Sequence, residues 1–278
     1  MSTCIALMCD CLDENVAPKL VLISDRLLSL GGTTSAEIAM KTRLVGNHWH
    51  VLFAGSDVSH ADAVMNIMID RIIRDKIKED AETVSEAFLQ AYHEVRKKQI
   101  EHRFLSTFGW TINQFLKLGR RSLPVSHYSS ILTNIQQFDL GCEFVLCGIE
   151  KHSLVPHLYI VENPGVATPL DVMGFAAIGA GSANATAYLT LREQAAHHDL
   201  MTTIYNGIAA KAMSEKALGV GRETDVVIVE RGEAARFLRE PEKIKEIWES
   251  EERFRFPKNW KQRVGRLLKY SDQNGIPI

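Results

Sequence analysis

Four positions within the first fifty-five residues constrain this chain more than any other feature. Ser2 follows Met1 directly, and a small residue there allows Met1 to be removed, leaving a free α-amine beside a hydroxyl. An α-amine has an unperturbed pKa of about 7.7–8.0, so it can act as a base for its own side chain near neutral pH. Such a nucleophile also needs a cation, a carboxylate that binds the cation, and a backbone donor for the oxyanion. Lys41, Asp25 and Gly55 are the candidates for these three roles.

The spacing of these residues resembles that of a known family. Asp25 and Lys41 lie sixteen residues apart, and Lys41 and Gly55 fourteen, as in proteasome β subunits and their simpler bacterial relatives. The surrounding sequence is similar too, in Ile38-Ala39-Met40-Lys41, in Phe53-Ala54-Gly55 and in the opening Ser2-Thr3-Cys4-Ile5-Ala6-Leu7. The resemblance covers roughly residues 2–230 and suggests a proteasome-type N-terminal nucleophile (Ntn) hydrolase.

The resemblance implies an α+β fold, the four-layer αββα sandwich of the Ntn hydrolases, with a helical C-terminal extension. We expect residues 1–232 to form the proteasome-like domain, with an insertion at about 104–140. Residues 233–278 would form the extension, with Trp248 and Trp260 as possible anchors.

The implied function is hydrolysis of peptide bonds in peptides or unfolded proteins, inside a homo-oligomeric double ring. By this resemblance Ser2 is the nucleophile and, through its amine, the base of a threonine-type endopeptidase mechanism. Lys41 lowers the pKa of the nucleophile, Asp25 anchors Lys41, and Gly55 donates to the oxyanion. The substrate channel is expected to be lined by Leu28, Ser29 and Phe53. No cofactor is expected, and no ATP-binding motif is present, so unfolding of substrates would need a separate ATPase.

The chain also departs from the family pattern. Ala180, in Gly179-Ala180-Gly181-Ser182, occupies the place of a serine that positions the terminal amine, and Ser182 is a possible substitute. For the second carboxylate of the family Glu215 is the better candidate and Asp225 the weaker.

Thr3 could replace Ser2 as the nucleophile if both preceding residues were removed. Asp25 could pair with the adjacent Arg26 instead of Lys41. At the level of function, the chain could be a catalytically inactive structural ring subunit, like the proteasome α subunits, or an Ntn amidohydrolase that acts on a small amide.

Composition excludes several other classes. The net charge of −2 and the pI of about 6.6 argue against a nucleic-acid-binding surface. Five cysteines without a secretory signal favour reduced thiols, and no apolar run approaches the roughly 18–20 residues that cross a bilayer. We therefore expect a cytoplasmic protein without a membrane segment. His48 and His50 lack further partners, so no metal site is predicted.

Hydrophobic periodicity predicts the main elements. Helices are expected from Ala61, from a capping box at Thr83-Val84-Ser85-Glu86, over Phe104–Leu118 except at Gly109, with a break at Gly119-Arg120-Arg121, and after Pro124. Two later helices are expected over Ala185–His197 and Met201–Ala217. Strands are expected at Cys4–Met8, Lys19–Ile23, Leu27–Leu30, Arg43–Val45, Trp49–Ala54, Glu143–Ile149, His157–Glu162 and Asp225–Val229.

Overall fold

The computed structural model describes residues 2–11, 16–30, 34–75, 77–150, 153, 155–231 and 233–251. The fold is mixed α and β, with antiparallel sheets and helices packed on them. One five-stranded sheet has the order β10-β1-β2-β11-β12, and the other has the order β5-β6-β7-β8-β9. A separate two-stranded ribbon joins β3 (Leu27–Leu30) to β4 (Thr34–Glu37).

The first sheet is buried on both faces. Its strands are β1 (Cys4–Cys9), β2 (Lys19–Asp25), β10 (Phe175–Ile178), β11 (Thr224–Glu230) and β12 (Arg236–Phe237). Side chains alternate along a strand, so Cys4, Ala6 and Met8 pack in a core shared with the second sheet. Ile5 and Leu7 pack instead in a core shared with helices. This burial on both faces explains why β1 is an unbroken apolar run.

The second sheet contributes to two cores in the same way. Its strands are β5 (Thr42–Leu44), β6 (Trp49–Gly55), β7 (Cys142–Ile149), β8 (Pro156–Glu162) and β9 (Val166–Pro169). Leu52 and Ala54 face the first sheet, whereas Val51 and Phe53 pack in the core that includes helices α1 and α2. The sheets are thus joined through β1, β2, β6 and β7.

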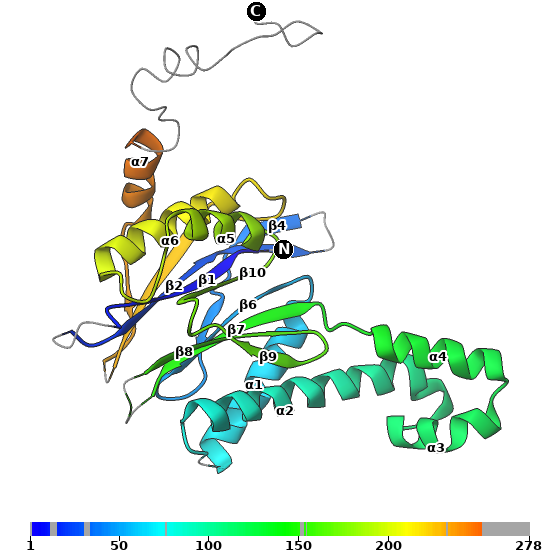
Figure 1. Cartoon of the computed structure of the whole chain (residues 1–278). Coiled ribbons are helices and arrows are strands. Elements are labelled where there is room, and N and C mark those ends of the chain that lie inside the picture. The colour runs from blue at the N-terminus through cyan, green and yellow to red at the C-terminus, as the bar shows by residue number, and fades with distance from the viewer. Residues whose placement is uncertain are drawn as a thin grey trace, which may run out of the picture.

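Helices cover the outer faces of the two sheets (Figure 1). Helices α1 (Val58–Asp75) and α2 (Ala81–Ile100) lie against the second sheet, and Met68 and Phe88 are among the side chains that they bury there. Helices α5 (Ser182–Leu191) and α6 (Leu200–Ser214) lie against the first sheet, where Leu189 and Ile208 are buried.

The expected insertion forms an arm that projects from the body (Figure 1). Helix α2 continues into a π-helical turn, Glu101–Leu105, and a 3₁₀ turn, Ser106–Phe108, before α3 (Ile112–Ser122) and α4 (Val125–Gln137). The predicted break at 119–121 is wrong, because Gly119 lies inside α3 and packs against Phe115 and Tyr128. The chain reverses earlier, at Gly109, which has a φ of +65°.

The C-terminal part of the described chain packs back on the body. Strand β12 extends the first sheet beside β11, and α7 (Pro241–Glu251) follows. Trp248 is buried against Ala209, Ala212 and Tyr188, so it anchors α7 to α6 and α5 as predicted. Trp260 lies outside the described residues.

Two further predictions about local structure need correction. The N-cap of α2 is Asp80, whose side chain accepts a hydrogen bond from the backbone N–H of Thr83 at 2.8 Å, so Thr83 lies inside the helix. Helix α1 begins at Val58, before Ala61. Strands β4, β9, β10 and β12 were not predicted. In the described part of the chain, no helix is long and apolar enough to cross a membrane.

Candidate active site

Ser2, Lys41 and Asp25 form a continuous chain of polar contacts. The Nζ atom of Lys41 lies 2.6 Å from the Oγ atom of Ser2 and 2.9 Å from Oδ1 of Asp25. All three are buried, with exposed fractions of 4% for Ser2, 2% for Lys41 and 0% for Asp25. A buried ammonium is costly unless it is paired and hydrogen-bonded, and this lysine is both.

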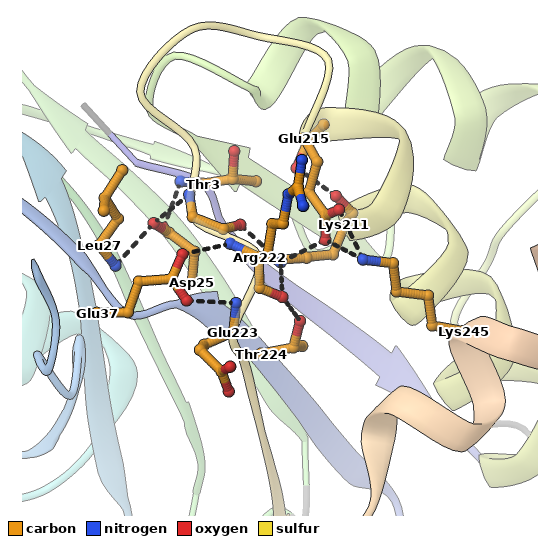
Figure 2. A network of polar contacts seen from close by, with 12 residues as sticks. Thr3, Asp25, Leu27, Glu37, Lys211, Glu215, Arg222, Glu223, Thr224 and Lys245 are labelled. Atoms are coloured by element: carbon orange, nitrogen blue, oxygen red, sulfur yellow. Dashed lines mark hydrogen bonds and ion pairs between the residues drawn. The ribbon is translucent and has the colours of Figure 1, made fainter.

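Asp25 is held by backbone donors from three segments. It ends β2, and its Oδ1 atom accepts a hydrogen bond from the N–H of Thr3 at 2.8 Å. Its Oδ2 atom accepts from the N–H groups of Leu27 at 3.1 Å and Gly221 at 3.0 Å (Figure 2). With Lys41, four donors surround the carboxylate, so its orientation toward the ammonium is fixed. Charge-assisted hydrogen bonds of this kind are stronger than neutral ones.

Lys41 lies between β4 and β5, and this position brings its side chain to the site. It follows the β3–β4 ribbon and directly precedes β5, and its carbonyl accepts a hydrogen bond from the N–H of Phe53 at 3.1 Å. The backbone at Lys41 is therefore joined to β6 while the side chain extends to Asp25 and Ser2. A lysine at the flank of a strand is usually solvated, whereas Lys41 is buried and paired.

Of the two N-terminal hydroxyls, the one next to the lysine belongs to Ser2. Thr3 donates its backbone N–H to Asp25, but its Oγ1 atom lies close to Gly181, where an added Cβ would come within 2.0 Å of it. This buried Oγ1 atom has no hydrogen-bond partner among the described residues. Cys4 is fully buried in β1, and burial raises the pKa of its thiol. The geometry thus favours Ser2 over Thr3 and Cys4 as the candidate nucleophile.

A small pocket of about 20 Å³ opens beside Ser2. Leu28, Phe53 and Gly55 line it together with Lys41, so the structure brings together two of the three expected channel residues. The side chain of Ser29, the third, lies outside the described residues.

Gly55 lines a second, larger pocket as well. The second pocket, of about 620 Å³, is lined by the acidic residues Asp139, Glu143 and Glu162 and by the turn Gly179–Ala180. Gly55 has a φ of +155°, and an added Cβ would approach the carbonyl oxygen of Gly141 to 2.2 Å. Only glycine fits at this point, which lies at the border of both pockets.

The turn that contains Ala180 contacts the N-terminal strand through its backbone. The N–H of Gly181 lies 3.4 Å from the carbonyl oxygen of Ser2, and the N–H of Gly179 donates to Oε2 of Glu143 at 2.8 Å. Ser182, the proposed substitute for the missing serine, begins α5, and its own N–H donates to Gly179. Glu143 was not predicted, although a carboxylate at an inward-facing position of an apolar strand is a signal that could have found it.

The two candidates for a second carboxylate have other partners. The Oε1 and Oε2 atoms of Glu215 contact the ammonium groups of Lys211 and Lys245 (Figure 2). Asp225 accepts from Nε of Arg26 at 2.9 Å. Arg26 therefore pairs with Asp225 and leaves Asp25 to Lys41, which excludes the alternative pairing of Asp25 with its neighbour.

The described residues contain no group of three or more His, Cys, Asp or Glu side chains that could hold a metal ion. The chain matches no protein-family model, and no curated protein sequence matches it. The geometry of Ser2, Lys41 and Asp25 is therefore the main basis for a functional argument.

Proposed function

We propose that this chain is a proteasome-like Ntn peptidase in which Ser2, after removal of Met1, is the nucleophile. The observation that carries the proposal is the 2.6 Å contact between Oγ of Ser2 and Nζ of Lys41, with Asp25 on the other side of the ammonium. A cation at this distance stabilises the alkoxide of Ser2 and so makes loss of the Oγ proton easier. In this proposal the two sheets and their covering helices correspond to the four-layer αββα sandwich of the Ntn hydrolases.

The proposed reaction has two stages. In the first, the α-amine of Ser2 accepts the proton from Oγ, and Oγ attacks the carbonyl carbon of the scissile peptide bond. The negative charge on the carbonyl oxygen would be stabilised by the backbone N–H of Gly55. The C–N bond then breaks, the leaving amine takes the proton, and an ester with Ser2 remains. In the second stage water, deprotonated by the same α-amine, hydrolyses the ester and restores Oγ–H.

Substrate and assembly follow from the same proposal. Leu28 and Phe53 would contact a side chain of a peptide or unfolded protein next to the scissile bond. The resemblance to proteasome subunits suggests a homo-oligomeric double ring in the cytoplasm, supplied by a separate ATPase where folded substrates must be unfolded.

Intact mass and covalent labelling test the proposal directly. The mass should show that Met1 has been removed. A peptide epoxyketone, which reacts with a hydroxyl and an adjacent free amine, should label the wild-type protein once, at Ser2. Ser2→Ala should abolish labelling. Thr3→Val is the matched control: it removes the neighbouring hydroxyl, preserves the shape of the side chain and should leave labelling intact.

Two results would contradict this mechanism. Retention of Met1 in the purified protein would mean that the proposed base does not exist. Labelling that persists in Ser2→Ala and disappears in Thr3→Val would move the nucleophile to Thr3.

A structural ring subunit without activity is the second candidate function. It is favoured by Ala180, which lacks the hydroxyl of the family's serine, and by Glu215, whose carboxylate is engaged by two lysines. An assembled ring that has lost Met1 but is not labelled would support this candidate. A small-amide Ntn amidohydrolase is the third, and turnover of small amides without turnover of peptides would support it.

A further inference from the structure

A second buried lysine lies close to the candidate site but does not contact the nucleophile. Lys211, on α6, is 1% exposed and donates to Oε1 of Glu215 at 2.6 Å. It also donates to the carbonyl oxygens of Gly221 at 2.8 Å and Arg222 at 2.9 Å. An ammonium has three N–H groups, so these contacts use all of them. Lys211 therefore holds the loop between α6 and β11 through the carbonyl oxygens of that loop.

The same loop contacts Asp25 by its N–H groups. Gly221 donates to Oδ2 of Asp25 at 3.0 Å, and Arg222 and Glu223 donate to the carboxylate of Glu37 at 2.8 and 2.9 Å (Figure 2). An added Cβ at Gly221 would come within 2.8 Å of the Cβ of Leu27 and 3.1 Å of Oδ2 of Asp25. The loop thus lies against Asp25 so closely that only glycine fits, and a shift of its carbonyls would change the hydrogen bond to Asp25.

Helix α7 contacts the other end of this network. Nζ of Lys245 lies 2.9 Å from Oε1 and 2.6 Å from Oε2 of Glu215 (Figure 2). The buried side chain of Trp248 holds α7 against α6, close to this ion pair. The carboxylate of Glu215 therefore bridges a lysine of α7 to the buried lysine of α6. The pair is partly buried, with side chains 20% and 13% exposed, so bulk solvent screens it less than a surface pair.

We propose that Lys211 and Lys245 are positioning residues for the candidate active site, and that docking of α7 is coupled to the nucleophile through them. The coupling runs from Lys245 to Glu215, Lys211, the Gly221 loop, Asp25 and Lys41, and ends at Ser2. With Lys245 in place, the charge of Glu215 is shared between two ammonium groups, and Lys211 also engages the loop carbonyls. Without it, Glu215 attracts Lys211 alone and the hydrogen bonds to the loop weaken.

This inference deepens the proposed function and rests on it. According to this inference α7, which follows β12, affects the reaction rate at a site formed by residues within the first 55. A partner or modification that displaced α7 would slow the nucleophile without touching the pocket beside Ser2.

The test compares three substitutions on α7 in the full-length protein. Lys245→Met removes the bridge, Lys245→Arg retains a cation for Glu215, and Lys243→Met is the matched control, because Lys243 pairs with the exposed Glu240 on the surface. Epoxyketone labelling of Ser2 gives a maximal rate and a half-saturating concentration for each. For Lys245→Met we expect the maximal rate to fall roughly two- to tenfold, the range that one hydrogen bond represents. The half-saturating concentration should not change, since Leu28 and Phe53 are untouched.

The other two variants and a second measurement complete the test. Lys245→Arg should restore most of the rate, and Lys243→Met should match the wild type. Hydrogen exchange of the Gly221 amide should be faster in Lys245→Met than in Lys243→Met, because its bond to Asp25 opens more often. If wild-type Ser2 is not labelled, the proposed function fails, and this exchange rate alone decides whether α7 is coupled to Asp25. If the wild type is labelled, equal labelling kinetics of Lys245→Met and Lys243→Met would overturn the inference. Equal hydrogen exchange of the Gly221 amide in these two variants would also overturn it.

Discussion

Two buried lysines near Asp25 have opposite kinds of surroundings. Lys41 contacts one carboxylate and a hydroxyl, that of Ser2. Lys211 contacts one carboxylate, that of Glu215, and two backbone carbonyls. A carbonyl is only an acceptor, whereas a hydroxyl can lose its proton to a base and is then stabilised by the adjacent cation. In the proposed function this difference gives Lys41 a part in the chemistry and Lys211 a positioning role.

The burial of both lysines has a cost in free energy. Removing an ammonium from water costs several kcal/mol, and pairing returns that energy only with good geometry and further hydrogen bonds. Neither lysine is therefore explained by stability alone. In the proposed function Lys41 would act on the nucleophile, and Lys211 would fix the position of the Gly221 loop.

The largest expected effect is that of Lys41→Ala. The change removes the cation beside Ser2. Epoxyketone labelling should therefore slow by about 100- to 1000-fold, the range found when one oxyanion donor is lost. Assembly should change little, which size-exclusion chromatography would show. Lys41→Arg should also fail, because a planar guanidinium does not fit the point between Ser2 and Asp25. Normal labelling of Lys41→Ala would mean that the comparison assigns chemistry to the wrong lysine.

Asp25→Asn should be the next most damaging change. It preserves the size of the side chain but leaves the Lys41 ammonium buried without its carboxylate, which costs about 3–5 kcal/mol when one partner of a buried pair is removed. We expect a lower free energy of unfolding in urea and little labelling. If Lys41 were instead a solvated residue, the stability change would stay within about 0.5 kcal/mol. The matched Asp139→Asn, at an exposed carboxylate lining the larger pocket, should change stability little.

Much of the sheet structure could be predicted from sequence, because its strands are apolar runs. Strands such as β1, β2, β6 and β7 are buried, and hydrophobicity alone indicates them. By contrast, β4 and β9 are short; β9 is half-buried or exposed and β4 carries the polar sequence Thr-Ser-Ala-Glu, so neither has a hydrophobic pattern to find. At the start of α2 the sequence offers two capping residues, Asp80 and Thr83, and in the structure the N-cap is Asp80.

The site was predictable only where its members are close in the sequence. Spacing suggested Ser2, Asp25 and Lys41, all within 41 residues. Gly221 reaches Asp25 across 196 residues, a separation that no local pattern encodes. Lys211 looks like an ordinary helix lysine, although its neighbours Ile208, Ala209, Ala210 and Ala212 are all buried. A lysine inside such an apolar segment is the signal that could have identified it.

His50 is a third buried basic residue and, unlike the two lysines, it has no carboxylate partner in the described part of the chain. It lies on β6, its Nδ1 atom has no hydrogen-bond partner among the described residues, and burial, together with the nearby His48, lowers its pKa from 6.5 to about 4. The unfolded chain therefore binds more protons than the folded one between these pH values. Stability should fall by about 3 kcal/mol as pH decreases from 6.5 to 4. His50→Leu should not show this loss in urea unfolding measured across that range. An equal acid loss in both proteins would place the titrating group elsewhere.

The smallest expected effect concerns Lys211 and pH. Burial lowers the pKa of Lys211, and the charge of Lys245 lowers it further, while Glu215 opposes both by raising it. Because the folded pKa is below the ordinary unfolded value of about 10.4, the unfolded chain binds more protons below that pH. The contribution of Lys211 to the free energy of unfolding is then fully present above about pH 10.4, and it is lost as the pH falls through the folded pKa. We expect the free energy of unfolding of the wild type to rise, relative to Lys211→Met, between neutral pH and 10.4. The rise should be small because Glu215 offsets part of the effect of burial. A relative decrease over the same range would mean that pairing with Glu215 outweighs burial, and Lys211 would then be a stabilising ion pair whose charge the fold favours.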